Sequence, residues 1–256
     1  MYKFRFCILG SGSKGNAAYY EPNGDGNGFM IDIGFPDKRI ESGLAGINRN
    51  FEDNVFEVFI THEHGDHLPA RKRGIYSIES VFGDERKVPV AGGNMYAPSP
   101  ESLVTRFPLV HDTKCYGFLI EAEGTRVAHV TDTGDIPCES LKHLLGLHAL
   151  VIEANRDELL IDDLIDEGHV PLSRIEHSIE DHFSNQQMAD LVEAVAWPGL
   201  EYVVLIHLSE SNNTPELELR AAEYALGEYW VERGGECRVV VSSQDRATPL
   251  IILKGG

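Results

Sequence analysis

Short apolar runs, bounded by glycine, proline and polar turn residues, follow one another along the first 153 positions of the chain. Runs of this length that are rich in Val, Ile, Phe and Tyr are typical of β-strands. The dipeptide Glu123-Gly124 separates two of the runs, as expected for a hairpin turn. We therefore expect strands at residues 3–9, 17–21, 28–33, 55–61, 88–91, 103–110, 116–122, 125–131 and 149–153.

Helical periodicity is clearest in the last third of the chain. Four apolar residues share one face of the segment 185–196, and Ser184 can cap its N-terminus. A second helix is expected at 215–229, which begins with proline. The segment 92–99 has the composition of a loop. Further helices are predicted at 68–76, 141–147, 157–166 and 172–180, and further strands at 202–206, 237–241 and 248–253.

This alternation of strands and helices predicts an α/β fold in which helices cover the sheets. The 256 residues contain no low-complexity segment or linker, so we expect one domain over 1–256. No stretch of about 18 apolar residues occurs, which predicts no membrane partner, and the N-terminus lacks the features of a signal peptide. Four scattered cysteines without a CxxC pair predict a cytoplasmic location.

The chain is strongly acidic. It has 41 acidic and 22 basic residues, a formal net charge of −19. Such a charge is unfavourable for binding nucleic acid, because phosphates are usually met by a basic surface. Bound divalent ions would add local positive charge that this number omits. Acidity that only improves solubility is the alternative interpretation.

Candidate chemistry is concentrated in THEHGDHL, residues 61–68, directly after an apolar strand. In an extended segment His62 and His64 point to the same side and can bind one metal together. Past Gly65 the chain must turn, so Asp66 and His67 can face a second metal. Imidazole and carboxylate groups suit zinc, iron or manganese. A solvated polar loop is the alternative, but four ligand-type residues at this spacing favour a metal site.

Three further ligand candidates each follow a predicted strand. They are His111, Asp132 and His207. A lone His or Asp after a strand is usually structural. Active sites of α/β proteins gather where strands end, and the shared position of these three residues therefore supports a common site.

These motifs resemble the metallo-β-lactamase fold superfamily over almost the whole chain. The resemblance is greatest to the YycJ/WalJ-type branch, whose members are metal-dependent nucleases. The pattern HxHxDH alone indicates the superfamily, whereas SGSKGN and the last two motifs indicate the branch. The matching segments are SGSKGN (11–16), MIDIG (30–34), HDTKCYGFLI (111–120), HVTDTGDI (129–136), IEANRD (152–157), DHFSN (181–185) and IHLSESNNTPELE (206–218).

The resemblance implies a four-layer αββα fold, with two β-sheets between layers of helices. It also implies two divalent metal ions, zinc or else manganese, which would generate a bridging hydroxide for attack on phosphorus. Asp66 would orient that hydroxide as a catalytic residue, and Asp32 would support the loop by hydrogen bonds. Glu63 receives no role. The first ion would be bound by His62, His64 and His111, the second by Asp66, His67 and His207, and both by Asp132.

Substrate contacts are expected where the helix at 185–196 begins, because a helix N-terminus favours anions. His182, Ser184 and Asn185 would contact the scissile phosphate, with His182 as the catalytic proton donor. The alternative is that Ser184 only caps the helix and His182 is a surface residue. Arg156 stands where the branch has histidine; it would hold a phosphate by a forked contact or merely balance the acidic surface.

Other motif residues receive simpler interpretations. SGSKGN is not a P-loop, and we expect a tight turn beside the metals, from which Lys14 could touch substrate. The remaining histidines, at 129, 143, 148, 169 and 177, are interpreted as structural or exposed. Cys115 and Cys138 are interpreted as small core residues.

The sequence thus predicts a binuclear metal-dependent phosphodiesterase, most simply a nuclease acting on DNA or RNA. One alternative is a phosphodiesterase for a small cyclic nucleotide, which the acidic charge favours. Others are a hydrolase of a lactam, lactone or thioester, and a protein that keeps the fold for binding alone. The partner would be nucleic acid or a small phosphodiester, and a homodimer stays open.

Overall fold

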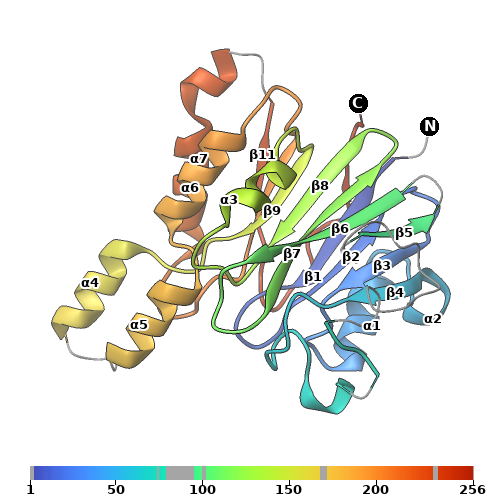
Figure 1. Cartoon of the computed structure of the whole chain (residues 1–256), viewed down its shortest axis with the longest axis horizontal. Helices are drawn as coiled ribbons and strands as arrows, with labels where there is room; N and C mark the ends of the chain where they lie inside the picture. Colours follow the sequence, from blue (N-terminus) through green and yellow to red (C-terminus); the bar gives the residue numbers. More distant parts are fainter. Residues whose placement is uncertain are drawn as a thin grey trace.

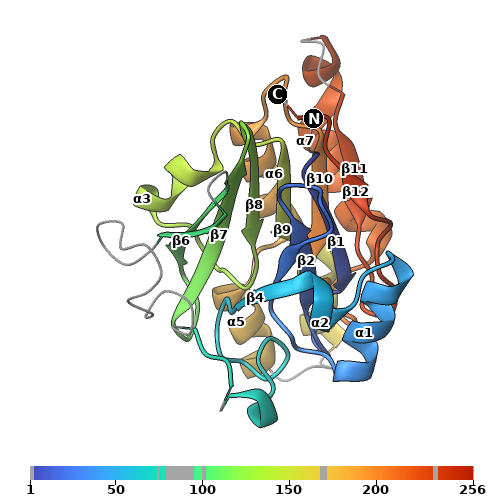
Figure 2. The same cartoon turned by 90° about the vertical axis from the view of Figure 1, so that its right-hand side faces the viewer.

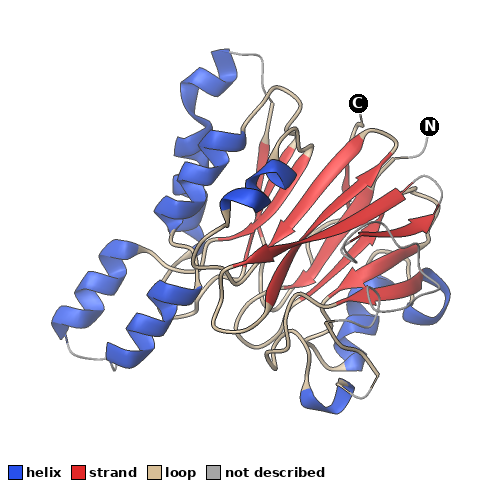
Figure 3. Ribbon diagram, viewed as in Figure 1, coloured by secondary structure: helices blue, strands red, loops and turns tan. Residues whose placement is uncertain are grey.

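The computed structural model describes residues 3–73, 75–78, 95–99, 102–167, 172–232 and 236–255. Two β-sheets face each other, and helices lie on the outer face of each sheet (Figures 1 and 3). The predicted four-layer αββα arrangement is confirmed. No helix in the described parts of the chain is long and apolar enough to span a bilayer.

The five-stranded sheet has the order β12-β1-β2-β3-β4. Its strands pair antiparallel except for β3 and β4, which are parallel and are joined through α1 and α2. Ile40 and Leu44 of α1 are buried against this sheet. The elements are β1 (Arg5–Gly10), β2 (Ala17–Glu21), β3 (Gly28–Ile31), α1 (Asp37–Gly46), α2 (Phe51–Asn54), β4 (Val55–Phe59) and β12 (Ile251–Ile252).

The seven-stranded sheet has the order β11-β10-β9-β8-β7-β6-β5. The half from β8 to β11 is parallel and the half from β5 to β8 is antiparallel. The strands are β5 (Met95–Ser99), β6 (Ser102–Leu109), β7 (Cys115–Ala122), β8 (Thr125–Val130), β9 (Ala149–Glu153), β10 (Tyr202–Ile206) and β11 (Arg238–Val241).

Helices α6 and α7 pack on the outer face of the seven-stranded sheet, with α3 beside them (Figure 1). Helices α4 and α5 extend away from the sandwich as a pair. The helical elements are α3 (Cys138–Leu141), the 3-10 turn η2 (Lys142–Leu144), α4 (Glu158–Glu167), α5 (Leu172–Asp181), α6 (Asn185–Val195) and α7 (Pro215–Glu232).

A central apolar core fills the space between the sheets. Its aromatic rings come from both sheets: Phe29 and Phe59 meet edge to face with centroids 4.9 Å apart, and Phe118 lies 5.7 Å from Phe59. Burying such rings removes a large apolar area from water. This core fixes the sheets against each other, so the strand ends of both sheets are held along one edge, as Figure 2 shows.

Most predicted strands and helices are found within one or two residues of their expected bounds. Three predictions were wrong. The loop predicted at 92–99 contains β5, the helix predicted at 68–76 is only the 3-10 turn η1 (Ala70–Lys72), and the helix expected at 141–147 is split into α3 and η2. Pro69 precedes η1 as its N-cap residue, and the turn is held in place by the Lys72 ammonium, which donates to the carbonyls of Ile33 and Phe35 at 3.2 Å. The strand expected at 88–91 lies outside the described residues.

Candidate metal centre

The loop at residues 61–68, hereafter the metal loop, turns tightly after β4. The backbone N–H of Leu68 donates to the carbonyl of His64 at 2.7 Å, which closes the turn. Gly34 lies against it so closely that a Cβ there would be 1.6 Å from the carbonyl oxygen of Asp66. A side chain at Gly34 would therefore push the loop, and Asp66 with it, out of place.

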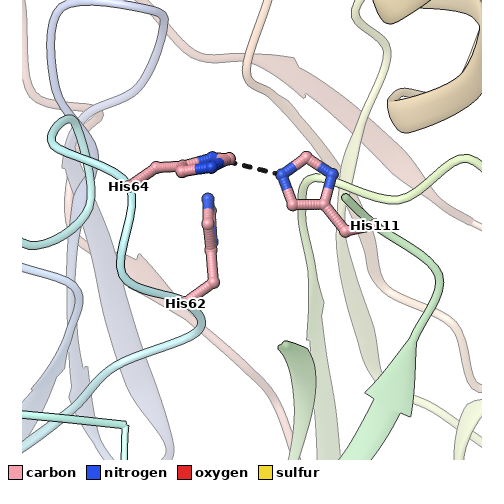
Figure 4. A group of neighbouring side chains, drawn as sticks. All are labelled: His62, His64 and His111. Atoms are coloured by element: carbon pink, nitrogen blue, oxygen red, sulfur yellow. Dashed lines mark hydrogen bonds between the residues drawn. The ribbon is translucent and has the colours of Figure 1, made fainter. Parts of the chain in front are cut away.

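The first group of ligand-type side chains is His62, His64 and His111. One nitrogen from each ring lies within 4.8 Å of the others. Figure 4 shows the three rings pointing toward one another, with Nδ1 of His64 3.3 Å from Nε2 of His111. Nε2 of His62 is buried and has no hydrogen-bond partner among the described residues. A buried imidazole nitrogen without a partner is destabilising unless a ligand, such as a metal ion, takes its lone pair.

The second group is Asp66, His67 and His207. Oδ2 of Asp66 lies 3.4 Å from Nε2 of His67 and 3.5 Å from Nε2 of His207. His67 comes from the metal loop and His207 from the end of β10, far away in sequence. The two sheets therefore meet at this group.

Asp132 lies between the two groups, at the end of β8. Its carboxylate oxygens are 3.1 Å from Nε2 of His67, 3.4 Å from Nε2 of His207 and 4.0 Å from Nε2 of His62. Asp132 and His207 both adopt a left-handed backbone, with φ of 52° and 56°. Strained backbone of this kind is concentrated at functional sites.

The imidazoles of both groups have polar partners on the ring nitrogens that face away from the cluster. Such partners fix the tautomer and leave the other nitrogen free to bind a metal. The pairs are His62 with Thr61 Oγ1 (3.1 Å), His64 with Asp112 Oδ1 (3.4 Å), His111 with the Asp181 carbonyl (3.1 Å), His67 with Asp32 Oδ2 (2.7 Å) and His207 with Glu153 Oε2 (3.6 Å).

The charges of the cluster strongly affect one another. Burial favours the neutral acid at Asp132, but the surrounding imidazoles outweigh it and hold the pKa of this carboxyl well below its usual range. Burial likewise opposes protonation of His207, yet Asp132, Asp66 and Glu153 raise the pKa of His207 to about 10. These carboxylates therefore favour positive charge at the centre of the site, which is where a divalent cation would be stabilised.

The SGSKGN segment, residues 11–16, contacts the residues of the second group. The Asn16 amide donates to Oδ2 of Asp66 at 3.3 Å and lies 2.9 Å from Nε2 of His67. Ser11 Oγ donates to Oδ1 of Asn16 and accepts from the backbone N–H of His207. The tight turn that we expected beside the metals is found here.

Lys14 of the same segment points outward. Its ammonium pairs with Glu210 at 2.5 Å, and both side chains are exposed. Gln244 accepts a hydrogen bond from the Lys14 backbone N–H.

His182, predicted to contact the scissile phosphate, lies at the edge of the cluster. Its ring stacks on that of His207 with centroids 5.1 Å apart, and its Nδ1 is 3.7 Å from Oδ1 of Asp132. The same Nδ1 is 3.0 Å from Oε2 of Glu153, whose side chain is fully buried at the end of β9. Burial opposes protonation of His182, but Glu153 and Asp132 outweigh it, so its pKa is raised. His182 also lies within ligand-forming distance of Asp132 and His207.

The structure does not turn Ser184 and Asn185 toward the cluster. Ser184 is fully buried; its hydroxyl accepts from the backbone N–H of Gln187 and donates to Glu158. It forms a capping box with Gln187 at the start of α6. The buried Asn185 amide is bound by the side chains of Asp157 and Asn213. Their contacts support the helix-cap interpretation rather than contact with a phosphate.

Arg156 is also internal. Its guanidinium donates to the carbonyl of His182 and, at 3.2 Å, to Oε1 of Gln187. Because the guanidinium is buried and bonded inside the protein, it is neither exposed to a substrate nor placed to offset the charge of the acidic surface. It holds the turn that carries His182.

The remaining predictions have mixed outcomes. His129 is buried, and Nδ1 of its ring is 2.7 Å from the Tyr20 hydroxyl, as expected for a structural residue. Cys115 is in the core, whereas Cys138 is exposed at the start of α3, so its assignment to the core was wrong. His169 lies outside the described residues.

Sequence reasoning missed two residues at this site. Glu153 is the last residue of β9, and Asp132 follows the neighbouring strand β8. The tendency of active-site residues to gather where strands end could therefore have pointed to Glu153. Asp112 follows His111 in the sequence, and its half-exposed carboxylate lies 3.3 Å from Nε2 of that residue. The sequence shows that Asp112 is next to His111. It does not show that the Asp112 carboxylate contacts His64, which follows a strand of the other sheet.

Taken together, the donor set suits divalent metal ions. Imidazole nitrogens and carboxylate oxygens converge at His62, His64 and His111 and at Asp66, His67 and His207, while Asp132 groups both with His62 and His67 and with His182 and His207. Nε2 of His62 has no hydrogen-bond partner among the described residues. The structure thus brings together all seven of the predicted ligands. Zinc and manganese both accept such a mixture of ligands.

Comparison with known proteins agrees with this geometry. No family model matches the chain. Exodeoxyribonuclease WalJ of Streptococcus pneumoniae is 28% identical over 96% of this chain and 97% of its own length. Exodeoxyribonuclease YycJ of Bacillus anthracis is 26% identical over 87% of this chain and 89% of its own.

A solved structure has the same fold. The metallo-β-lactamase fold protein YhfI from Bacillus subtilis matches with a TM-score of 0.64 and 13% identity, covering 96% of this chain and 99% of its own. The WalJ and YycJ relatives span nearly the full length of the chain. The chain is therefore similar over nearly its whole length to the WalJ and YycJ exodeoxyribonucleases, and it has the fold of the metallo-β-lactamase fold proteins.

Proposed function

We propose that the protein is a metal-dependent hydrolase of phosphodiester bonds, and specifically a nuclease that uses two divalent ions to cleave DNA. The similarity to two exodeoxyribonucleases over most of the chain supports the reaction and the substrate. Zinc is the ion that we favour, and manganese is the alternative.

One observation carries the proposal: two groups of ligand-type side chains share the single carboxylate of Asp132. Its Oδ2 lies 3.1 Å from Nε2 of His67, and its Oδ1 lies 3.4 Å from Nε2 of His207 and 4.0 Å from Nε2 of His62. A pair of nearby ions bound in this way would supply an activated water and neutralise charge on the phosphoryl group. A site for only one ion would not need a carboxylate in this central position.

The residues around this centre have separable roles. Asp132 and Asp66 would supply the carboxylate ligands. The imidazoles are oriented by the polar groups that contact their other ring nitrogens. His182 donates a proton to the leaving oxygen of the cleaved bond. Glu153 accepts a hydrogen bond from Nδ1 of His182 at 3.0 Å, which keeps that ring oriented and favours its charged form. Arg156 and Ser184 position the turn and helix that carry His182.

A small phosphodiester, such as a cyclic nucleotide, is the second candidate substrate. The net charge of −19 and the half-exposed carboxylate of Asp112 beside His64 favour it, since both repel a long polyanion. Duplex DNA carries its phosphates too densely to avoid this repulsion.

The test is a panel of substrates given to the metal-loaded protein: single- and double-stranded DNA, RNA, cyclic mononucleotides and bis-p-nitrophenyl phosphate. Asp132→Ala, prepared and loaded in the same way, is the control for contaminating nuclease. We expect DNA cleavage that is lost in Asp132→Ala. Cleavage of cyclic mononucleotides alone would replace the proposal with the small-ligand alternative, and no cleavage of any phosphodiester would refute both.

A further inference from the structure

The carboxylate of Asp112 lies at the solvent-exposed edge of the first group of ligand-type side chains. Its Oδ1 is 3.3 Å from Nε2 of His111 and 3.4 Å from Nε2 of His64. The Asp112 side chain is 40% exposed, whereas that of His111 is 1% exposed. A carboxylate in this position either orients the neighbouring imidazoles or binds the same ion as they do. The positions of the ring protons bear on which role applies.

The hydrogen bonds of His111 determine which of its ring nitrogens has a lone pair. Its Nδ1 is 3.1 Å from the backbone carbonyl oxygen of Asp181. Because a carbonyl oxygen only accepts hydrogen bonds, Nδ1 carries the proton of the neutral ring and Nε2 has the lone pair. The Asp112 carboxylate that faces this Nε2 is also an acceptor. Two acceptors 3.3 Å apart are unfavourable unless a proton or a metal ion lies between them.

The proton of His62 is placed in the same way. The Thr61 hydroxyl donates to Oδ2 of Asp32 at 2.8 Å, so its oxygen accepts from Nδ1 of His62, 3.1 Å away. The lone pair of His62 is therefore on the buried Nε2, which has no hydrogen-bond partner among the described residues. A neutral His64 has a single N–H to offer to the acceptors around it. A divalent ion at this place would take the lone pairs and neutralise the carboxylate of Asp112.

The separations between these atoms also fit the ligands of one ion. Zinc binds imidazole nitrogen and carboxylate oxygen at about 2.0–2.2 Å in a tetrahedral arrangement, so two of its ligand atoms lie about 3.3–3.5 Å apart. Oδ1 of Asp112 is 3.3 Å from Nε2 of His111, and Nδ1 of His64 is 3.3 Å from the same nitrogen. Asp112 is thus as close to this nitrogen of His111 as the predicted ligand His64 is.

We propose that Asp112 is a fourth protein ligand of the ion bound by His62, His64 and His111, and that it caps this ion on the solvent side until a substrate phosphate displaces it. Three imidazoles and one carboxylate complete a tetrahedral set and leave no open position. This inference rests on the proposed function and specifies how the phosphate reaches the ion. The alternative is that Asp112 only orients His64 through Nε2 of that ring, 3.4 Å away.

A cysteine in place of Asp112 tests direct binding by spectroscopy. A thiolate bound to cobalt adds a charge-transfer band in the near ultraviolet, whereas a thiol that does not contact the ion adds none. Asp112→Cys is therefore loaded with cobalt beside the wild type, whose four cysteines give the baseline spectrum. Thr113→Cys, which carries a thiol one residue further along the same loop, is the control. Metal content is measured in all three proteins.

A second measurement follows the displacement of the cap by inorganic phosphate. The affinity of phosphate for the zinc-loaded wild type, Asp112→Ala and Glu63→Ala is measured by isothermal titration calorimetry. Glu63 is exposed in the metal loop between His62 and His64, so Glu63→Ala removes a nearby carboxylate to which no contact with the ion is assigned. A difference between the two variants separates loss of the cap from a general loss of negative charge.

We expect the new near-ultraviolet band in Asp112→Cys alone. Phosphate should bind Asp112→Ala about tenfold more tightly than the wild type, because a site that is capped in about nine of ten molecules loses affinity by that factor. Glu63→Ala should bind phosphate within about twofold of the wild type, since solvent and salt screen an exposed charge.

Absence of the band from an Asp112→Cys protein that holds two cobalt ions would overturn the cap but leave the nuclease proposal intact. If Asp112→Cys does not hold two ions, the phosphate measurement decides: equal affinity in Asp112→Ala and the wild type would overturn the cap, and tighter binding than in Glu63→Ala would support it. Failure of the wild type to bind any divalent ion would overturn both proposals.

Discussion

The two halves of the metal centre are built differently. In the half formed by Asp66, His67 and His207, the imidazole of His67 is fully buried and its outer partner Asp32 is 1% exposed. In the half formed by His62, His64 and His111, the His64 side chain is 39% exposed and its partner Asp112 is 40% exposed. Interactions between buried charges are strong, whereas water and salt weaken the interactions between exposed charges.

This difference predicts unequal behaviour of the two ions that we propose. The buried half is held by Asp32, Asn16 and Glu153, all three of which are buried. The open half depends on His64 and Asp112, which solvent reaches. We infer that the ion of the buried half is bound tightly as a structural and catalytic component. The ion of the open half would exchange and would meet the substrate first.

The largest effect is expected from Asp132→Ala, which breaks the link between the halves. Removing the shared carboxylate leaves several imidazoles without their central anion, so both ions should bind more weakly. Activity should fall by about a thousandfold or more, and metal content measured by mass spectrometry should fall below two per chain. Full metal content together with full activity would show that the halves are independent.

A matched pair of substitutions tests the difference in burial. Asp32→Asn and Asp112→Asn each remove one carboxylate charge, from the partner of His67 in the buried half and from the partner of His64 and His111 in the open half. We expect about a hundredfold loss of affinity for one ion in Asp32→Asn and about tenfold in Asp112→Asn, because removing such partners generally weakens metal binding 10- to 100-fold. Competition with a chromophoric chelator measures both values. Equal losses would contradict the comparison.

His182→Ala should separate chemistry from metal binding. His182 lies beside the shared carboxylate but is not among the seven predicted ligands. We expect kcat to fall by about 10²–10⁴, the usual contribution of a general acid, with metal content near that of the wild type. Loss of both ions in this variant would instead make His182 a ligand, and its role as a proton donor would be abandoned.

The smallest effect should come from a site that belongs to neither half. Glu218 on α7 is buried without a hydrogen-bond partner for its carboxylate among the described residues, and burial raises its pKa to about 9. The unfolded chain releases this proton near pH 4.3, so Glu218 lowers stability progressively as pH rises from there to about 9. Glu218→Gln should therefore raise the free energy of unfolding by about 1–3 kcal/mol at pH 8 and by much less at pH 5.

Chemical denaturation at the two pH values measures this change, with metal content as the control. A metal-dependent shift in Glu218→Gln would show that stability and the metal centre are coupled through α7. An equal effect at both pH values would mean that Glu218 is ionised in the folded protein.

Much of this structure was predictable from sequence, because both sheets consist of short apolar strands with clear boundaries. The candidate ligands could be picked out because HxHxDH closely follows β4, and because His111, Asp132 and His207 follow β6, β8 and β10 of the seven-stranded sheet. Helix α1 was missed, since its segment has two glycines and only two buried apolar residues, Ile40 and Leu44. Its helical form depends on packing against the sheet rather than on its own pattern.

The substrate residues were harder to predict for a physical reason. Ser184, Asn185 and Arg156 are polar residues near a helix start, and the sequence does not show whether their hydrogen bonds are made inside the protein or to a ligand. The structure satisfies them internally.

The most direct test of the central claim is a titration of metal-free protein with zinc or manganese, in which cleavage of a single-stranded DNA is followed as ions are added. The account predicts tight binding of a first ion with little activity, and cleavage that appears only with the second ion. Full cleavage after one equivalent, or cleavage that persists in Asp132→Ala, would contradict a centre made of two linked and unequal halves.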